Sequence, residues 1–468
     1  MSDLILLVPE LGLVVTALAL LMVARRITHA RSAATWVVVA SIAAIYSASA
    51  FGEAIPAAGF GGTIAGDGYT QFFKILFAGT VALVALLSVR YLDEEGVRPG
   101  EYYALLLLAA TGMMLAASAL DLVTLYLGLE LTALCSYVLV GITRDRPSSN
   151  EAAIKYLLLG SFASAVLLYG IAFAYGLTGA TDYASIASAL SALRLGGSPL
   201  LFVSVALLAG GLAFKIAAVP FHAWAPDAYQ GASAPIAAFL AAGSKAAGLA
   251  ALGRLSLVAF APEQGIWSII LVGFAALSMT IGSLIAVSQS DMKRLLAYSS
   301  IAHAGYALLG LIPGTPDGIS ATMTYAFVYA FMTLGAFAIV IGLGERGERL
   351  AGYEGLAATA PVTAGFMLLF LLSLTGIPPT AGFAAKFGVI LSVVRAGHVA
   401  LAVLAVACSV VSAFFYLRVA TLMYMTTPQG LAPGHIPGAV FAVLVVAAFV
   451  TLVGGILPDT FAPWTSPP

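Results

Sequence analysis

The sequence contains very little charge. Only 9% of its 468 residues are Asp, Glu, Lys or Arg, against roughly 25% in an average soluble domain. The acidic and basic residues nearly balance, and the formal net charge is −1. The chain has no excess of basic residues, which would attract nucleic acid, and no excess of acidic residues. We therefore expect no nucleic-acid partner.

Cysteine is also scarce. Cys135 and Cys408 lie in apolar stretches far apart in the sequence, so they indicate neither a disulfide framework nor a cluster of metal ligands. A thiol in an apolar stretch is usually a small core residue. The sequence shows no phosphate-binding glycine motif on a strand-to-helix turn and no zinc-type spacing. We therefore expect no cofactor and no metal in this chain.

Hydrophobic residues, in contrast, make up 61% of the chain, and the mean hydropathy is +1.04. A helix needs about 20 apolar residues to cross the hydrocarbon core of a bilayer. The sequence predicts an all-α, polytopic membrane protein with about fourteen transmembrane helices. The predicted spans are 4–24, 33–50, 70–92, 102–119, 121–143, 151–176, 200–230, 234–257, 266–288, 293–312, 318–343, 361–394, 398–425 and 437–457.

Orientation follows from the lysines and arginines between the spans, because cytoplasmic loops carry the excess of positive charge. The odd-numbered connections hold eleven of these residues and the even-numbered ones hold three. We therefore expect odd connections in the cytoplasm and both termini on the opposite side. The eleven are Arg25, Arg26, Arg31, Arg90, Arg98, Arg144, Arg146, Lys293, Arg294, Arg346 and Arg349, and the three are Arg194, Arg254 and Arg395.

The seventh span is interrupted. Its sequence, LLAGGLAFKIAAVPFHAWAPDAYQGASAP, carries Lys215 in its first half and Pro220 and Pro226 further on. Lipid cannot satisfy the backbone groups that a proline frees, so such a span is buried among other helices or lines a water-filled cavity. Discontinuous helices of this kind recur as ion or substrate sites in transporters.

The twelfth span is interrupted in the same way, by Pro378 and Pro379, and also carries a lysine, Lys386. Paired interrupted helices at corresponding positions are typical of inverted-repeat transporters. We expect discontinuous helices 7 and 12 within two inverted five-helix repeats. The predicted division is 1–100 for the three N-terminal helices, 101–258 for the first repeat, 259–426 for the second and 427–468 for the last helix.

Four ionisable side chains lie well inside these spans, away from their ends: Glu130, Lys215, Lys245 and Lys386. A charge at the bilayer centre costs about 2.5–3.5 kcal/mol, so four cost on the order of 10 kcal/mol before any pairing. A buried lysine needs an anion, and we expect Glu130 to pair with Lys215. A lysine whose partner approaches or withdraws is suited to carry protons. The alternatives are ion pairs that only hold helices together, or lysines that reach the membrane interface.

Five further residues are weaker candidates. Lys155, near the cytoplasmic end of the sixth span, suits a relay or an interface anchor equally. His222 and His303 titrate near neutral pH and are suited to pass protons between lysines. Asp227 suits a proton-entry group or a helix-end residue, and Lys74 is expected to be an interface anchor.

Four stretches carry a family resemblance: YLGLELTALCSYVLVG, FKIAAVPFHAWAPDAYQGASAP, SQSDMKRLLAYSSIAHAGY and LTGIPPTAGFAAKF. They resemble the antiporter-like subunits of respiratory complex I, the proton-pumping NADH:quinone oxidoreductase. The chain is most similar to subunit N, because its twelfth span carries a lysine where subunit M has a glutamate. The likeness covers nearly the whole chain and implies a central polar axis along which protons move.

The resemblance assigns a role to each matching position. It implies that Glu130 modulates Lys215, that Lys245 connects the two halves of the axis, and that Lys386 is its terminal lysine. It adds two bridging histidines and two further lysines, namely His222, His303, Lys155 and Lys293.

The expected function is that of a proton-translocating, non-redox subunit in the membrane arm of NADH:quinone oxidoreductase. Its expected partners are membrane lipid, the antiporter-like subunit M and the small membrane subunits. NADH, FMN, iron–sulfur clusters and quinone are expected in other subunits. The expected location is the bacterial inner membrane, with both termini periplasmic. The alternatives are a subunit of a multi-subunit sodium/proton antiporter and a structural spacer in the membrane.

Overall fold

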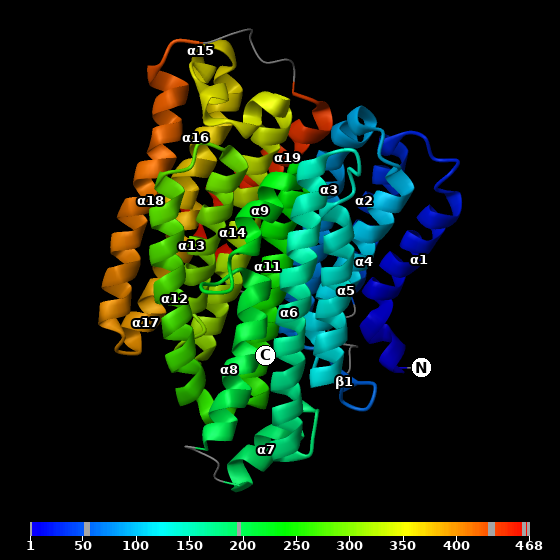
Figure 1. The fold of residues 1–468 in the computed structure, drawn as a ribbon, viewed down its shortest axis with the longest axis vertical. Coiled ribbons are helices and arrows are strands. Elements are labelled where there is room, and N and C mark those ends of the chain that lie inside the picture. Colours follow the sequence, from blue (N-terminus) through cyan, green and yellow to red (C-terminus); the bar gives the residue numbers. More distant parts are fainter. Residues whose placement is uncertain (1, 51–56, 194–197, 429–435, 461–464, 466–468) are drawn as a thin grey trace.

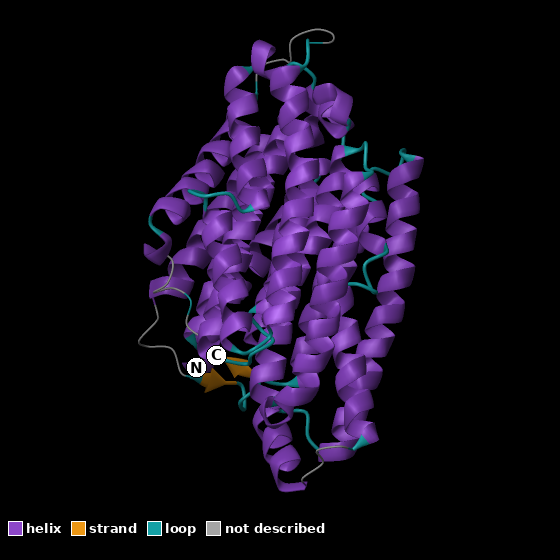
Figure 2. Cartoon of the chain, turned by 90° about the vertical axis from the view of Figure 1, so that its left-hand side faces the viewer, coloured by secondary structure: helices purple, strands orange, loops and turns teal. Residues whose placement is uncertain are grey.

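The computed structural model describes residues 2–50, 57–193, 198–428, 436–460 and 465. Long helices run along the longest axis of the molecule and pack side by side (Figure 1). The strands β1 (Ala58–Gly59) and β2 (Ile64–Ala65) form a small hairpin at the lower end (Figures 1 and 2). This hairpin lies in the connection between the second and third predicted spans, of which residues 51–56 lie outside the described residues.

The helices of the first half follow the predicted spans closely. They are η1 (Ser2–Leu7), α1 (Val8–Val23), α2 (Ala30–Ala50), α3 (Gly68–Glu95), α4 (Pro99–Ser118), α5 (Leu122–Val140), α6 (Pro147–Thr178), α7 (Tyr183–Leu193), α8 (Pro199–Ile216), α9 (Trp224–Gly231), α10 (Ala234–Phe239), η2 (Leu240–Ser244), α11 (Lys245–Arg254), η3 (Leu255–Ala259) and η4 (Ala261–Glu263).

The second half continues in the same way. Its helices are α12 (Gln264–Val287), α13 (Met292–Leu309), α14 (Pro316–Leu343), η5 (Gly344–Glu348), η6 (Leu350–Tyr353), α15 (Leu356–Thr359), α16 (Pro361–Thr375), α17 (Ala381–Arg395), α18 (Val399–Met425), α19 (Gly438–Ile456) and η7 (Pro458–Thr460).

Within the described residues, twelve helices are long and apolar enough to cross a membrane. The all-α, multi-pass membrane fold is therefore confirmed. Two predicted spans are missing from the twelve: α13, which is rich in polar residues, and the interrupted pair α16 and α17. The count of fourteen, the inverted repeats and the four predicted divisions stay predictions.

The eighth predicted span is at the centre of the bundle. The most apolar part of Ala234–Ala259 is entirely buried, whereas only a third of the corresponding part of Asp3–Val23 is. The outer helices instead present large apolar side chains, such as Val39, Phe162 and Val410, each at least 60% exposed. An apolar outer surface suits lipid or neighbouring membrane subunits.

The break in the seventh span, residues 217–223, contains Pro220 but not Pro226. Helix α8 ends at Ile216, Ala217 adopts a left-handed conformation (φ 55°), and α9 begins at Trp224. The left-handed conformation costs a residue with a Cβ about 1–2 kcal/mol. The prediction that Pro226 also interrupts the span is wrong, because Pro226 lies in the first turn of α9, where a missing N–H costs nothing.

The twelfth span breaks between α16 and α17. Gly376 adopts φ 87° directly after α16, and α17 starts at Ala381 beyond the two prolines. A left-handed glycine after the last helical residue is a common helix ending, because glycine has no Cβ to clash. Both broken spans therefore expose the carbonyl end of a half-helix inside the protein.

One of the three arginines predicted to lie in the even-numbered connections lies elsewhere. Arg254 is not a loop residue: it is the last residue of α11, and only 1% of it is exposed. Arg194 lies outside the described residues.

Candidate functional site

The broken helix α8 places Lys215 in its last turn, against the free carbonyls of the helix end. Cations are favoured there by the helix dipole. As expected, the Lys215 ammonium lies 3.3 Å from the Glu130 carboxylate of α5. The same carboxylate oxygen accepts a short hydrogen bond from the Ser164 hydroxyl of α6. Three helices thus meet at one buried ion pair.

Lys245 begins α11 and is buried, with 3% exposure. Its ammonium donates a 2.6 Å hydrogen bond to the Ser300 hydroxyl of α13 and lies 5.9 Å from the centre of the Tyr229 ring. In the described part of the chain no carboxylate lies within ion-pair distance of Lys245. A hydroxyl and an aromatic face are thus its identified polar neighbours.

His303 lies one turn beyond Ser300 on α13 and is buried. Its Nδ1 shares a 2.6 Å hydrogen bond with the Tyr325 hydroxyl, and its Nε2 lies 3.3 Å from the Tyr416 hydroxyl. Each ring nitrogen of a neutral histidine is either donor or acceptor, and a hydroxyl serves both. The ring is therefore set between two groups that can exchange a proton with it.

Lys386 of α17 reaches across the second break. Its ammonium donates to the carbonyls of Leu374 (3.2 Å) and Thr375 (2.9 Å), which end α16, and to the Ser409 hydroxyl (3.2 Å). It also lies 4.4 Å from the centre of the Tyr306 ring. Like Lys215, it is held at the carbonyl end of a half-helix, where the dipole favours a cation.

A small cavity lies among these buried charges. It measures about 10 Å³ and touches Lys245 and His303, together with Ile216, the residue after Lys215. A site of about this size just holds one water molecule. On the far side, the Tyr306 ring lies 5.9 Å from His303 and borders Lys386. The buried charges therefore form a row across the molecule, with hydroxyls and one small cavity between them.

A second polar region opens at one end of the molecule. It is a cleft of about 1380 Å³ lined by charged side chains of both signs, among them Lys155, Asp227, Arg294 and Glu348. Asp227 lies 3.0 Å from Lys155 and 2.8 Å from Arg294. Lys293 lies beside the cleft, buried, with its ammonium 2.7 Å from Glu348. Asp227 thus joins two cations in the cleft from the first turn of α9, and its role as a proton-entry group stays a prediction.

The short helix α9 lies between the cleft and the row of buried charges. Asp227 and Gln230 line the cleft, whereas Tyr229 faces Lys245 and Ser300 on the inner side. His222 lies in the turn before α9 and is half-buried. In the described residues no hydrogen bond joins its ring to a buried lysine or to Glu130. His303 thus lies among hydrogen-bonding neighbours in the core and His222 does not, and the bridging role of each stays a prediction.

Hydroxyl groups are the part of the site that the sequence-based prediction missed. Ser300, Ser164 and Ser409 each bond to one of the buried charges. Their signal was present, because serines inside otherwise apolar spans are polar groups that need a partner. The run YSSIAHAGY in α13 carries two such serines, Ser299 and Ser300, within about one turn of His303.

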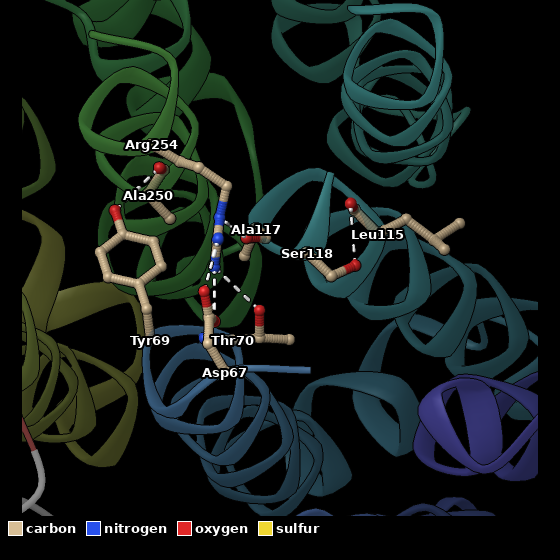
Figure 3. A network of polar contacts seen from close by, with 8 residues as sticks. All are labelled: Asp67, Tyr69, Thr70, Leu115, Ala117, Ser118, Ala250 and Arg254. Carbon is tan, nitrogen blue, oxygen red and sulfur yellow. Dashed lines mark hydrogen bonds and ion pairs between the residues drawn. The ribbon is translucent and has the colours of Figure 1, made fainter. Parts of the chain in front are cut away.

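Two further buried ion pairs lie outside the row. Lys74, expected to be an interface anchor, is instead 2.8 Å from Glu10, with both side chains at most 5% exposed. Arg254 donates two 2.7 Å hydrogen bonds to the Asp67 carboxylate, as Figure 3 shows. Arg254 was predicted to lie in a connection because ALGR ends an apolar run. Its partner Asp67 is 187 positions away in the sequence, so no local pattern indicates the pair.

The described residues contain no group of three or more His, Cys, Asp or Glu side chains placed to hold a metal ion. The row of buried charges consists instead of three lysines, one glutamate and one histidine in the membrane-spanning core. Such residues inside a membrane mark ion pathways and proton relays. The fold and the site thus define a multi-pass membrane protein of the ion-translocating class.

Known proteins match this class over the whole chain. Residues 119–412 match the family described as NADH:quinone oxidoreductase/Mrp antiporter, TM. The chain is 44% identical to NADH-quinone oxidoreductase subunit N 2 of Rhizobium meliloti, over 97% of this chain and 95% of the relative. It is 42% identical to subunit N of Desulfovibrio desulfuricans, over 99% and 96%.

Solved structures agree. A chain of respiratory complex I from Thermus thermophilus is 35% identical, with a TM-score of 0.83 over 97% of this chain and 98% of that one. A chain of the Mrp complex from Dietzia sp. superposes with a TM-score of 0.86 over 99% and 96%, but at 23% identity it shows the shared fold alone. The chain belongs to the NADH:quinone oxidoreductase and Mrp antiporter family of membrane subunits, and within it to the subunit N group.

Proposed function

We propose that this chain moves protons across a bacterial inner membrane as a subunit of NADH:quinone oxidoreductase. Electron transfer from NADH to quinone, with its flavin and iron–sulfur centres, takes place in partner subunits. The observation that carries this proposal is the row of Glu130, Lys215, Lys245, His303 and Lys386 through the core. Burying four charges at the cost estimated above is hard to account for unless they move ions.

Protons enter this scheme through the charged cleft. Lys155 and Asp227 face the open side, Lys293 lies behind them, and α9 carries Tyr229 from the cleft wall to Lys245. The arginines that line the cleft, Arg146 and Arg294 among them, belong to the positively charged connections. By the positive-inside rule this end faces the cytoplasm, and both termini face the periplasm.

The proposed cycle is electrostatic. A charge change in a neighbouring subunit loosens the Glu130–Lys215 pair, Lys215 gives up its proton towards Lys245, and His303 passes it on. Lys386 then releases the proton on the periplasmic side. The small cavity touches both Lys245 and His303, and the Tyr306 ring lies near both His303 and Lys386. In this scheme the two proposed five-helix repeats, 101–258 and 259–426, supply the two halves of the axis.

The position of Glu130 supports coupling to a neighbouring subunit. On α5, Leu127 and Leu134 flank it on the same face and are 60% and 56% exposed, while the Glu130 side chain is 21% exposed. A carboxylate that opens towards lipid is costly. This face therefore borders a partner in the membrane arm, such as the antiporter-like subunit M or one of the small membrane subunits.

The rival function is that of a subunit in a multi-subunit sodium/proton antiporter. This chain shares its fold with a chain of the Mrp complex. Relatives above 40% identity bear subunit N names, which favours the redox-linked function. The deciding experiment is to tag this polypeptide, solubilise it gently and assay what co-purifies. NADH oxidation with a quinone acceptor, together with flavin and iron–sulfur centres, supports the proposal. If only membrane subunits without redox activity co-purify, the result instead supports the antiporter function.

A further inference from the structure

The helix that carries Lys245 has an unusual construction. Helix α11 (Lys245–Arg254) lies between two π-helical turns, η2 before it and η3 after it. A π turn holds one residue more than an α turn, and such turns occur frequently at functional sites. Moving the extra residue through α11 would turn it by about 100°, because an α-helix has 3.6 residues per turn. The structure shows one of the two settings that such a shift would relate.

Between its two charged ends, α11 carries only small or aliphatic side chains. Its sequence is KAAGLAALGR, so all residues between Lys245 and Arg254 are Ala, Gly or Leu. Lys245 has no ion-pair partner among the described residues, and its hydroxyl contact is to a single serine. Two anchors lie further along this helix: the Tyr69 hydroxyl donates a 2.8 Å hydrogen bond to the Ala250 carbonyl, and Arg254, nine residues after Lys245, forms the charged anchor.

Arg254 is held on every side. Its Nη1 and Nη2 donate to Asp67 at 2.7 Å each, Nη2 also donates to the Thr70 hydroxyl at 2.9 Å, and Nε donates to the Ala117 carbonyl at 2.9 Å. The Tyr69 ring lies 4.7 Å from the guanidinium. These partners come from the start of α3 and the end of α4 (Figure 3). Bidentate pairing fixes orientation as well as distance.

We propose that Arg254 is a positioning residue for proton transfer: with Asp67 it clamps α11 in the setting in which Lys245 reaches Ser300. The inference rests on the proposed function, since it assumes that Lys245 carries protons. The clamp acts at a distance, through the helix backbone, and touches none of the buried lysines. Loss of one hydrogen bond to a charged group changes the balance between two settings by about ten-fold.

The test uses the complete enzyme in vesicles and measures protons translocated per NADH oxidised, alongside the amount of assembled complex. The variants are Asp67→Asn, which retains the shape of the side chain, and Arg254→Lys, which retains the charge without the fork. The matched control is Lys74→Met, because Lys74 forms a buried ion pair on the same helix α3 but bonds to Glu10 and Leu6 instead. The clamp predicts a lower proton ratio in the first two variants and an unchanged ratio in the control.

A double-mutant cycle shows whether the clamp acts through Lys245. In a Ser300→Ala background, the contact that the clamp serves is already gone, so Asp67→Asn should cause no further loss in the ratio. Additive losses would contradict the proposal. So would a ratio that stays at the parent value in Asp67→Asn and Arg254→Lys, with only assembly reduced as in Lys74→Met. If Lys245→Met itself left the ratio unchanged, the proposed function would fail instead, and the two failures are thus distinguishable.

Discussion

The Glu130–Lys215 pair gives the sharpest prediction about the axis. At 3.3 Å, Coulomb's law with an effective dielectric constant of about 20 gives about 5 kcal/mol of attraction. Removing one partner of a buried pair costs about 3–5 kcal/mol, because the remaining charge is left without compensation. Glu130→Gln keeps the side-chain shape and the Ser164 contact but removes the charge. The charged form of Lys215, now without its partner, should then be disfavoured by at least about 100-fold.

The assay is the number of protons translocated per NADH oxidised by the complete enzyme in sealed vesicles. Glu130→Gln should lower this number strongly, and Glu130→Gln combined with Lys215→Met should lose no more than either change alone. The control is Glu94→Gln, whose side chain is 58% exposed and pairs with Arg90 at the surface, where ion pairs contribute about 0–1 kcal/mol. A Glu130→Gln enzyme that behaves like the Glu94→Gln enzyme would refute the reasoning.

Three further predictions concern neighbouring parts of the structure. Ser300→Ala should lower the proton ratio because it removes the hydroxyl bonded to the eighth-span lysine, whereas Ser300→Thr should retain most of it; equal losses in both would contradict the role of the hydroxyl. Gly376→Ala should lower the ratio more than Gly397→Ala. Both glycines adopt a left-handed backbone conformation. A Cβ added at Gly376 would lie 3.2 Å from the buried lysine of α17, whereas one added at Gly397 would meet nothing within 4 Å. For Asp67, burial raises the pKa, but its bonds to the guanidinium and to the start of α3 outweigh this and hold the pKa below the usual value. Its stabilising effect is therefore fully present above about pH 4 and lost as the pH falls through the lowered folded-state pKa. The difference in thermal inactivation between the parent enzyme and Asp67→Asn should shrink in that acid range, and a constant difference would contradict it.

The long apolar helices were predictable because the hydrophobic signal is local. Twenty consecutive apolar residues specify a membrane span whatever the rest of the chain does. The two spans that this signal describes poorly, α13 and the pair α16 and α17, are the ones that carry His303 and Lys386. In these spans the proposed function requires polar residues and helix breaks. Both weaken the hydrophobic signal by which a membrane span is recognised.

The buried charges were also predictable, because each is expensive in its own sequence context. Their partners were less so. Glu130 and Lys215 are 85 positions apart and could be paired by elimination, since few anions lie in the membrane. Arg254 and Asp67 are 187 positions apart and both lie near predicted span ends, where a charge raises no question. Only the three-dimensional packing of α3, α4 and α11 shows that this arginine is buried.

The measurement that tests the central claim most directly is the proton ratio of the Lys215→Met enzyme. The complete complex would be reconstituted in sealed vesicles, with NADH oxidation and internal or external pH followed together. Our account predicts fewer protons translocated per NADH oxidised than in the parent enzyme. An unchanged ratio with unchanged quinone reduction, in fully assembled complex, would show that the buried row holds helices together and does not carry protons.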